Sequence, residues 1–180
     1  NISSPNTPGL RGLQDKASLE ALLTACGAAE RNGKPVFLKV APDLDAEAIA
    51  DICGVVRGPG AWLSGLIVSN TTLARPESLQ CADKDQAGGL SGAPLMDPST
   101  DVLAAFAREL TGAFDLIGAG GIASGADAYR KIRAGAHAVQ FYSAMVYEGP
   151  GLAEQINKDL VRLLQADGFK SLAEAVGKDL

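Results

Sequence analysis

The chain has 180 residues, 47% of them hydrophobic, and its 16 basic and 21 acidic side chains give a net charge of −5 at pH 7. This length and composition predict one globular domain with a sizeable core and argue against disorder. Nucleic acid is a poor candidate partner, because the acidic sequence has no basic stripe that could neutralise a phosphate backbone.

The first part of the chain alternates helical and strand patterns. Apolar residues from Leu19 to Cys26 recur at the spacing of one helix face, and Gly33 suits a left-handed helix end. A β-rich apolar run stops at Pro42, and its near-continuous hydrophobicity is typical of a strand buried on both faces of a parallel sheet. We therefore expect a helix over 17–32, a strand over 36–41, a helix capped by Asp45 and a strand over 63–69.

The same alternation continues after a long irregular stretch over 73–98. Residues 100–110 predict a helix and 114–119 a strand. They are followed by a helix that Ser124 caps and Gly135 ends, and by a strand over 136–142. A last helix over 152–165 precedes a short element with a Ser171-x-x-Glu174 capping pattern.

Strands that alternate with helices over short connections predict a parallel sheet, either doubly wound or part of a (β/α)8 barrel. Polar or glycine residues follow every predicted strand, which favours the barrel, where functional residues come from the carboxyl ends of several strands. If the opening segment is the end of a strand, the chain covers about the last five βα units of a TIM barrel. The sequence lacks an initiator Met and begins within a motif, so we expect the C-terminal part of a longer protein.

Cysteine and histidine are sparse and give no catalytic or metal pattern. Cys26, Cys53 and Cys81 are odd in number and lack CxxC spacing, so we interpret them as reduced packing residues. His137, the only histidine, opens a predicted strand and so belongs to the barrel face associated with stability. We predict no metal site.

A glycine-rich turn, 118–123, matches the loose dinucleotide fingerprint G-x-G-x-x-A, so a Rossmann NAD site must be considered. However, the acidic ribose ligand expected at the end of the next strand is missing, since that region reads VQFYS. A phosphate site shared by the last two barrel loops explains Gly120 and Gly121 better. The plainest alternative is a tight turn without a ligand.

Three further features point to a ligand site at the strand ends. Residues 69–72, which read SNTT, carry neutral hydrogen-bonding groups where a buried strand ends. Lys39 lies within an apolar strand, where a buried charge is costly without an anionic partner, unless its long stem reaches the barrel mouth. The stretch over 73–98 is longer than ordinary connections and ends in GGLSGAPL, which lets backbone approach a ligand closely.

The opening residues, 1–11, read NISSPNTPGLR and place two amides, several hydroxyls and two prolines in one short segment. Pro5 restricts the backbone of Ser4 to extended or turn conformations, as in a loop that holds a polar planar ligand. This segment resembles the active-site loop of the dihydroorotate dehydrogenases. Ser4, where one branch of the family has Cys, points to the class 2, quinone-reducing branch. The strand-end motifs match that family in order from Asn1 to about Pro150.

The resemblance implies an oxidoreductase that converts dihydroorotate to orotate with FMN and a quinone in pyrimidine biosynthesis. Ser4 falls on the catalytic base, which takes the C5 proton, and Lys39 would stabilise charge on the reduced flavin. Ser69 stands where the family often has Thr. The positions that match FMN-binding residues are Asn1, Lys39, Ser69, Ser91, Gly92, Gly120, Gly121, Tyr142 and Ser143. Those that match residues holding dihydroorotate or orotate are Asn1, Asn6, Asn70 and Thr71.

By the same resemblance, residues 1–180 are the C-terminal part of one FMN-binding barrel domain. The family's N-terminal helices, which lie outside this sequence, imply peripheral attachment to the cytoplasmic side of a bacterial membrane or, in a eukaryote, to the mitochondrial inner membrane. Two other functions stay open. They are a class 1-like FMN enzyme with fumarate or NAD as acceptor, and a barrel that binds phosphate without catalysis.

Overall fold

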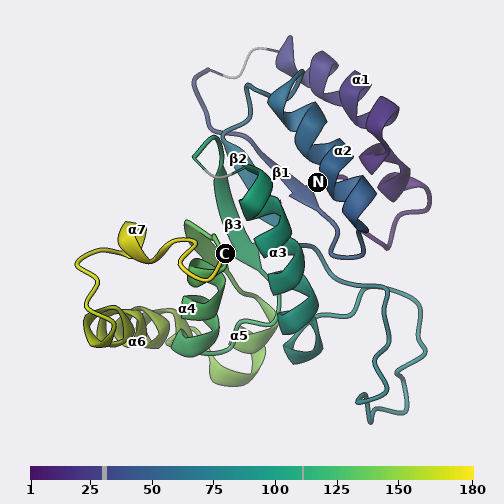
Figure 1. Ribbon diagram of the computed structural model, residues 1–180. Coiled ribbons are helices and arrows are strands. Elements are labelled where there is room, and N and C mark those ends of the chain that lie inside the picture. The colour runs from purple at the N-terminus through teal and green to yellow at the C-terminus, as the bar shows by residue number, and fades with distance from the viewer. Residues whose placement is uncertain (30–31, 111) are drawn as a thin grey trace.

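The computed structural model describes residues 1–29, 32–110 and 112–180, in which helices and strands alternate along the chain (Figure 1). The strands are β1 (Phe37–Val40), β2 (Gly65–Val68), β3 (Asp115–Ala119) and β4 (Ala138–Gln140). The helices and 3-10 turns are η1 (Leu10–Gln14), α1 (Lys16–Gly27), α2 (Ala46–Arg57), η2 (Ala93–Leu95), α3 (Met96–Leu110), α4 (Gly125–Arg133), α5 (Ser143–Glu148), α6 (Leu152–Ala166) and α7 (Leu172–Ala175).

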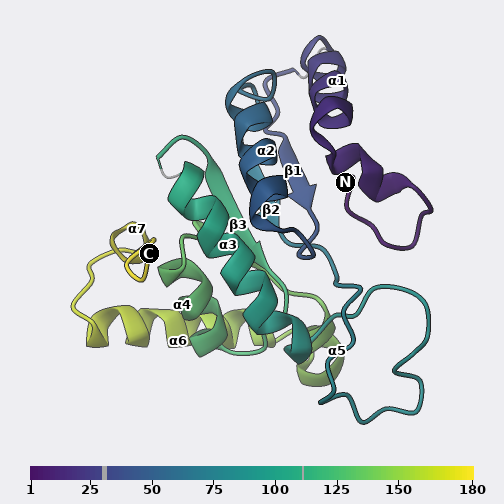
Figure 2. The same ribbon diagram turned by 45° about the vertical axis from the view of Figure 1, so that its right-hand side comes forward.

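The strands form one parallel sheet in the order β1-β2-β3-β4, the same as their order in the sequence. A doubly wound sheet would reverse its strand order at a switch point. Helices α2 and α3 lie along one face of the sheet, as Figures 1 and 2 show. Sequential parallel order with helices on one face is the arrangement of an arc of a (β/α)8 barrel, as the sequence predicts.

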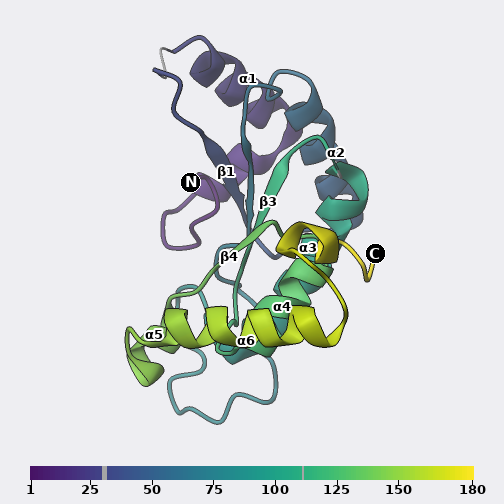
Figure 3. The same cartoon turned by 90° about the vertical axis from the view of Figure 1, so that its left-hand side faces the viewer.

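The core lies between the sheet and its helices. Paired residues in register face the same side of a parallel sheet, and the row Leu38, Leu66 and Leu116 is buried in the main core cluster with α1, α2 and α3. The adjacent row, which contains Lys39, Ile67 and Ile117, is only half-buried on the opposite face. The prediction that the strand over 36–41 is buried on both faces is therefore wrong for this chain. A second cluster joins α4, α6 and α7 beside β4, at the end of the sheet that Figure 3 brings forward.

Two predicted helix caps are confirmed. Asp45 Oδ1 accepts a hydrogen bond from Ala48 N at 2.8 Å, and Ser124 Oγ accepts one from Asp127 N at 3.1 Å. The capping pattern at α7 is only partly formed, because Glu174 Oε2 accepts from Lys170 N while Ser171 makes no cap hydrogen bond there. The carboxylate alone thus closes the start of this short helix.

Several predicted boundaries are wrong, each for a local physical reason. Helix α1 ends at Gly27, short of Gly33, because Trp62 packs against Gly27 and donates to the Leu23 carbonyl at 3.1 Å. Helix α3 begins at Met96, earlier than predicted, since Pro98 is tolerated in a first turn where its missing N–H is not needed. Helix α5 was not predicted.

Two further expectations are corrected. The opening segment, 1–4, is not a strand, so the described residues contain four strands where five were expected. Cys26 is exposed and does not pack in the core, whereas Cys53 is buried, and its burial raises the pKa of the thiol to about 11. Cys81 is also exposed, in the long loop. The structural role predicted for cysteine therefore holds for Cys53 alone.

Candidate functional site

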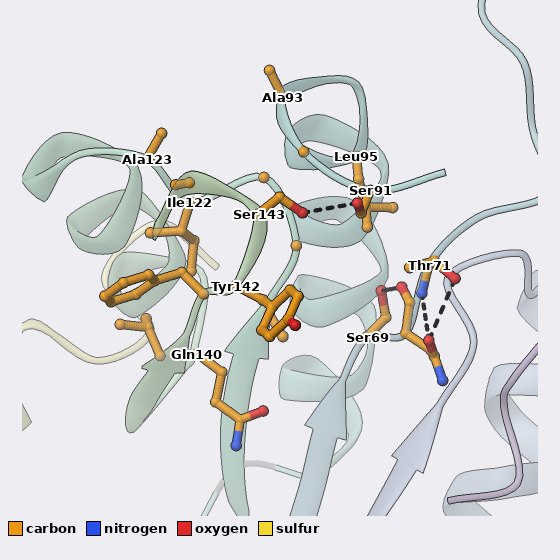
Figure 4. Close-up of a pocket in the computed structure, with 18 of the residues that line it drawn as sticks. Ser69, Thr71, Ser91, Ala93, Leu95, Ile122, Ala123, Gln140, Tyr142 and Ser143 are labelled. Carbon is orange, nitrogen blue, oxygen red and sulfur yellow. Dashed lines mark hydrogen bonds between the residues drawn. The ribbon is translucent and has the colours of Figure 1, made fainter. Parts of the chain in front are cut away.

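A cavity of about 650 Å³ lies at the carboxyl ends of the four strands. Its volume falls in the usual range for cofactor and small-molecule sites. Figure 4 shows the side chains that surround it, including the Tyr142 ring, which projects into the cavity. Of the residues predicted from the sequence, those that line it are Lys39, Ser69, Asn70, Thr71, Ser91, Gly92, Gly120, Gly121, Tyr142 and Ser143.

The end of β2 brings neutral hydrogen-bonding groups together with the opening segment. Asn70 Nδ2 donates to Asn1 Oδ1 at 3.2 Å and to Ser3 Oγ at 3.1 Å. The other side of the same amide, Oδ1, accepts from Thr71 N at 2.8 Å. Asn1 is therefore beside the cavity through Asn70, although it is not one of the residues that line the cavity. These amides form a surface that can recognise a polar heterocycle.

Lys39 is the cation of the cavity. It lies on β1, half-buried, and removal from water lowers the pKa of its ammonium below the ordinary value. Among the described residues that line the cavity there is no carboxylate. The site thus carries a positive charge without a lining anion, which favours a ligand that is negatively charged or becomes so.

The ends of β3 and β4, together with the loop before η2, supply close backbone approaches and hydroxyl groups. Gly121 has a φ of 77°, and a Cβ there would lie 2.4 Å from Met96 Cα, so no larger residue fits. Gly92, with a φ of 83°, would meet nothing within 4 Å, which leaves its face open toward the cavity. Ser91 Oγ and Ser143 Oγ lie 2.8 Å apart and point toward one another (Figure 4). This end of the cavity suits a phosphate group.

The opening loop lies near the Asn70 end of the cavity, away from Ser91 and Ser143. Ser4 is half-buried, and its Oγ accepts a hydrogen bond from Asn6 N at 3.3 Å. A Cβ on Gly89 would lie 1.8 Å from Thr71 Oγ1 and 2.8 Å from Pro5 Cγ. Neither Ser4 nor Asn6 lines the cavity in this chain. The contacts of Gly89 nevertheless hold the Ser4 loop against the end of β2.

Arg11 and Asp43 join three loops at this end, and neither was predicted from the sequence as a site residue. Arg11 donates to Asp43 Oδ2 at 2.7 Å, to the Ser3 carbonyl at 3.1 Å and to the Thr71 carbonyl at 2.8 Å. Asp43 also accepts from Thr72 Oγ1 and from Leu73 N. Two features of the sequence could have indicated these residues: Arg11 is the last residue of the opening motif, and Asp43 follows shortly after a predicted strand.

These contacts control the charge of Asp43. Burial alone would raise the pKa of its carboxyl. The hydrogen bonds from Thr72, Leu73 and Arg11 outweigh burial, so the pKa lies below its ordinary value. Asp43 is therefore ionised at neutral pH and remains paired with Arg11.

Lys131, another residue missed from the sequence, lies behind the glycine loop. Its side chain is fully buried and donates to Ser99 Oγ at 2.5 Å and to the Met96 carbonyl at 3.3 Å. Ser99 Oγ in turn contacts the Leu95 carbonyl at 2.6 Å and the Gly120 carbonyl at 3.3 Å. Burial lowers the pKa of Lys131 to about 7. No sequence signal separates this lysine from a solvated one on a helix.

Other groups lie away from the cavity. His137 precedes β4, at the end of the sheet opposite the cavity, and its Nδ1 accepts from Leu116 N at 3.1 Å. In the described ranges, no three His, Cys, Asp or Glu side chains gather as a metal-binding group. None of the helices in those ranges combines the length and apolarity needed to cross a membrane.

The sequence of this chain is similar to known proteins of one family. A family model described as dihydroorotate dehydrogenase matches residues 1–164. A dihydroorotate dehydrogenase (quinone) of Xanthobacter autotrophicus is 53% identical, with the match covering 100% of this chain and 52% of that protein. One from Halobacterium salinarum is 47% identical over 100% of this chain and 50% of that protein.

A solved structure agrees with these sequence matches. The DHODH of Eimeria tenella in complex with ferulenol superposes with a TM-score of 0.92 at 39% identity, over 99% of this chain and 53% of that one. The four-stranded sheet is therefore part of a (β/α)8 barrel. The chain spans about half the length of the curated relatives it matches.

Proposed function

The chain belongs to the dihydroorotate dehydrogenase family, and we propose that the full-length protein oxidises dihydroorotate to orotate in the synthesis of pyrimidine nucleotides (UMP). In this proposal FMN would supply the hydride acceptor, and a quinone would be the final electron acceptor. The observation that carries this proposal is the meeting of Lys39, the amide cluster at Asn70 and the glycine loop at Gly121 around one cavity.

The cavity fits FMN, which supplies a hydride acceptor when bound. Gly120 and Gly121 allow the turn after β3 to pack tightly against Ser99 and Met96, and Gly92 leaves an open backbone face toward the cavity. Ser91 and Ser143 add hydroxyl groups that could donate to a phosphate there. Tyr142, Ser69 and Asn1 complete the proposed FMN contacts. Lys39 places a positive charge at the strand ends, where it stabilises negative charge that develops during reduction.

Asn1, Asn6, Asn70 and Thr71 are proposed to hold dihydroorotate. Amide side chains both donate and accept, so they match the alternating N–H and C=O groups of the pyrimidine ring. The bonds between Asn70 and Asn1, and between Asn70 and Thr71, preorganise this group before substrate arrives. Thr71 is further fixed by the Gly89 backbone packed against it.

Ser4 is proposed as the base that removes the C5 proton of dihydroorotate. A serine hydroxyl is a poor base near neutral pH, so it needs a proton relay and exclusion of bulk water. Packing of Pro5 against Gly89 contributes to that exclusion. Replacing Ser4 with Ala should slow flavin reduction by about 100-fold or more while FMN stays bound. Unchanged reduction kinetics, measured by stopped-flow absorbance, would remove Ser4 from this role.

Attachment to a membrane is part of the same proposal. The relatives are named for a quinone, and because a quinone is a lipid-soluble acceptor, this name supports a reaction at a membrane surface. We expect N-terminal helices of the full-length protein to provide the contact, on the cytoplasmic side of a bacterial membrane or on the mitochondrial inner membrane of a eukaryote.

The experiment that tests the function mixes the full-length protein anaerobically with dihydroorotate while oxidised-flavin absorbance is followed. Rapid bleaching, with recovery on addition of a quinone and not of fumarate or NAD, supports the proposal. Recovery with fumarate or NAD would instead indicate a class 1-like enzyme. A coloured protein that does not bleach would contradict the substrate, and a colourless one would favour a barrel that binds phosphate without catalysis.

A further inference from the structure

Arg75 lies at the base of the long loop between β2 and η2, which projects from the carboxyl end of the sheet (Figures 1 and 2). Its guanidinium donates five hydrogen bonds, all of them to backbone carbonyls. Two go to the outgoing limb of the loop, to Leu73 at 3.1 Å and Ala74 at 3.2 Å. Three go to the returning limb, to Lys84 at 2.8 Å, Gln86 at 2.8 Å and Gly88 at 2.7 Å.

This bonding pattern differs from that of an ordinary surface arginine. Among the described residues Arg75 takes part in no ion pair. Its side chain is half-buried, and its planar fork spans carbonyls that are up to fifteen positions apart in sequence, from Leu73 to Gly88. A lysine has one ammonium with three donors and cannot reach the same set. The loop base is therefore closed by arginine specifically.

The returning limb leads from Arg75 directly to the proposed substrate end. Gly88, whose carbonyl Arg75 holds, lies beside Asn6, since a Cβ there would be 3.4 Å from Asn6 Oδ1. The next residue, Gly89, packs against Thr71 and Pro5. Leu90 then pairs with Thr72 through two backbone hydrogen bonds, of 3.1 and 2.8 Å. These contacts of Gly88, Gly89 and Leu90 are all with segments that carry a proposed substrate or base residue.

From this geometry we propose that Arg75 is a positioning residue for the dihydroorotate half-reaction. It holds Gly88 and Gly89 as a wall over Pro5 and Thr71, which fixes the Ser4 loop and keeps bulk water from it. This inference rests on the proposed function and adds a residue that touches neither substrate nor flavin. Loss of Arg75 leaves five carbonyls to be satisfied by water, so the wall loosens at its base.

The test compares R75A and R75K with the native full-length protein, and uses R162A as a matched control. Arg162 is an exposed arginine of α6 that pairs with Asp159 within its own helix. We expect kcat/KM for flavin reduction by dihydroorotate to fall about 10- to 100-fold in R75A, because small misplacements of catalytic groups cost that much. R75K should recover only a small part of the loss, and R162A should equal the native protein.

Two readouts separate positioning from a general structural effect. FMN content and the rate of flavin reoxidation by quinone should be unchanged in R75A, since the wall touches only the substrate end. Cleavage by trypsin after Lys84, which is exposed in the returning limb, should be faster in R75A than in the native protein.

Native kinetics in R75A, or full recovery in R75K, would overturn the proposal. So would equal losses of flavin, reduction and reoxidation, because they would indicate misfolding alone. If the native protein itself fails to bleach, the proposed function fails. The cleavage rates then decide separately whether Arg75 holds the loop, and equal rates in native protein and R75A would contradict that as well.

Discussion

Arg11 and Asp43 connect the opening loop with the ends of β1 and β2 through charge-assisted hydrogen bonds. Their side chains are only 20% and 29% exposed, so this ion pair is shielded more than the exposed pair between Lys16 and Asp51. Removing one partner of a shielded, hydrogen-bonded charge leaves the other without compensation. The Arg11–Asp43 contact therefore contributes more to stability than a surface ion pair does.

We predict that Asp43→Asn lowers the free energy of unfolding by about 1–3 kcal/mol at neutral pH. The pKa of the folded carboxyl is depressed below 3.8, so this stability is present above the unfolded value and is lost as pH falls through the folded value. Urea denaturation of the full-length protein at pH 7 and pH 3.5 should show the difference shrinking in acid. Asp51→Asn is the control and should change stability by less than about 1 kcal/mol.

Single residues also show what the sequence could and could not predict. The sequence points to Lys39 because it is a charge within an apolar strand, and to Asn70 because it is a polar side chain where a buried strand ends. Both line the cavity, since strand ends converge in a barrel. The roles of Arg11 and Arg75 were not predicted, because their carbonyl acceptors come from other loops or from distant parts of the same loop. Such bonds leave no periodic pattern in the sequence.

At the scale of elements, Lys131 joins α4 to the start of α3 and, through Ser99, to the Gly120 loop. The start of α3 is also one of the boundaries predicted wrongly from the sequence, because Pro98 normally indicates a loop but here occupies a first helical turn. Helix α5 was missed because its six residues are too few for a helical period to appear. Helix packing behind the Gly120 loop thus depends on a buried amine that no local pattern reveals.

We predict that Lys131→Met flattens the pH dependence of stability. The folded pKa of about 7 lies below the ordinary 10.5, so the folded state is penalised below pH 7 and recovers stability as pH rises from 7 toward 10.5. The native protein should gain about 1 kcal/mol per pH unit relative to the variant near pH 8. Chemical denaturation at pH 7, 7.5, 8 and 8.5 measures this slope.

The exposed Lys158 of α6, which pairs with Glu154, provides the control for this slope. Lys158→Met should give a curve parallel to that of the native protein. Cys53 is common to all the variants, so ionisation of its thiol cancels in each difference. Parallel curves for native protein and Lys131→Met would show that Lys131 does not carry a strongly lowered pKa.

At the scale of the whole molecule, the four-stranded arc leaves surfaces that a closed barrel covers. In the described sheet β1 and β4 each have a neighbouring strand on one side only. The face that carries Ile67 and Ile117 is half-buried. Tyr142, Val146 and Tyr147 are 85%, 77% and 84% exposed around α5. Unpaired strand edges beside exposed apolar side chains favour association between chains.

We therefore predict that these 180 residues, expressed alone, self-associate in a concentration-dependent way. Light scattering coupled to size-exclusion chromatography at several loading concentrations measures this directly. V146K, which places a charge in the exposed apolar group at α5, should raise the monomer fraction without abolishing association, because the strand edges remain. A native 180-residue chain that is monomeric at every concentration and melts cooperatively would contradict this prediction. The arc would then be stable as a unit, and its strand edges and exposed apolar side chains would not need the rest of the barrel to prevent association.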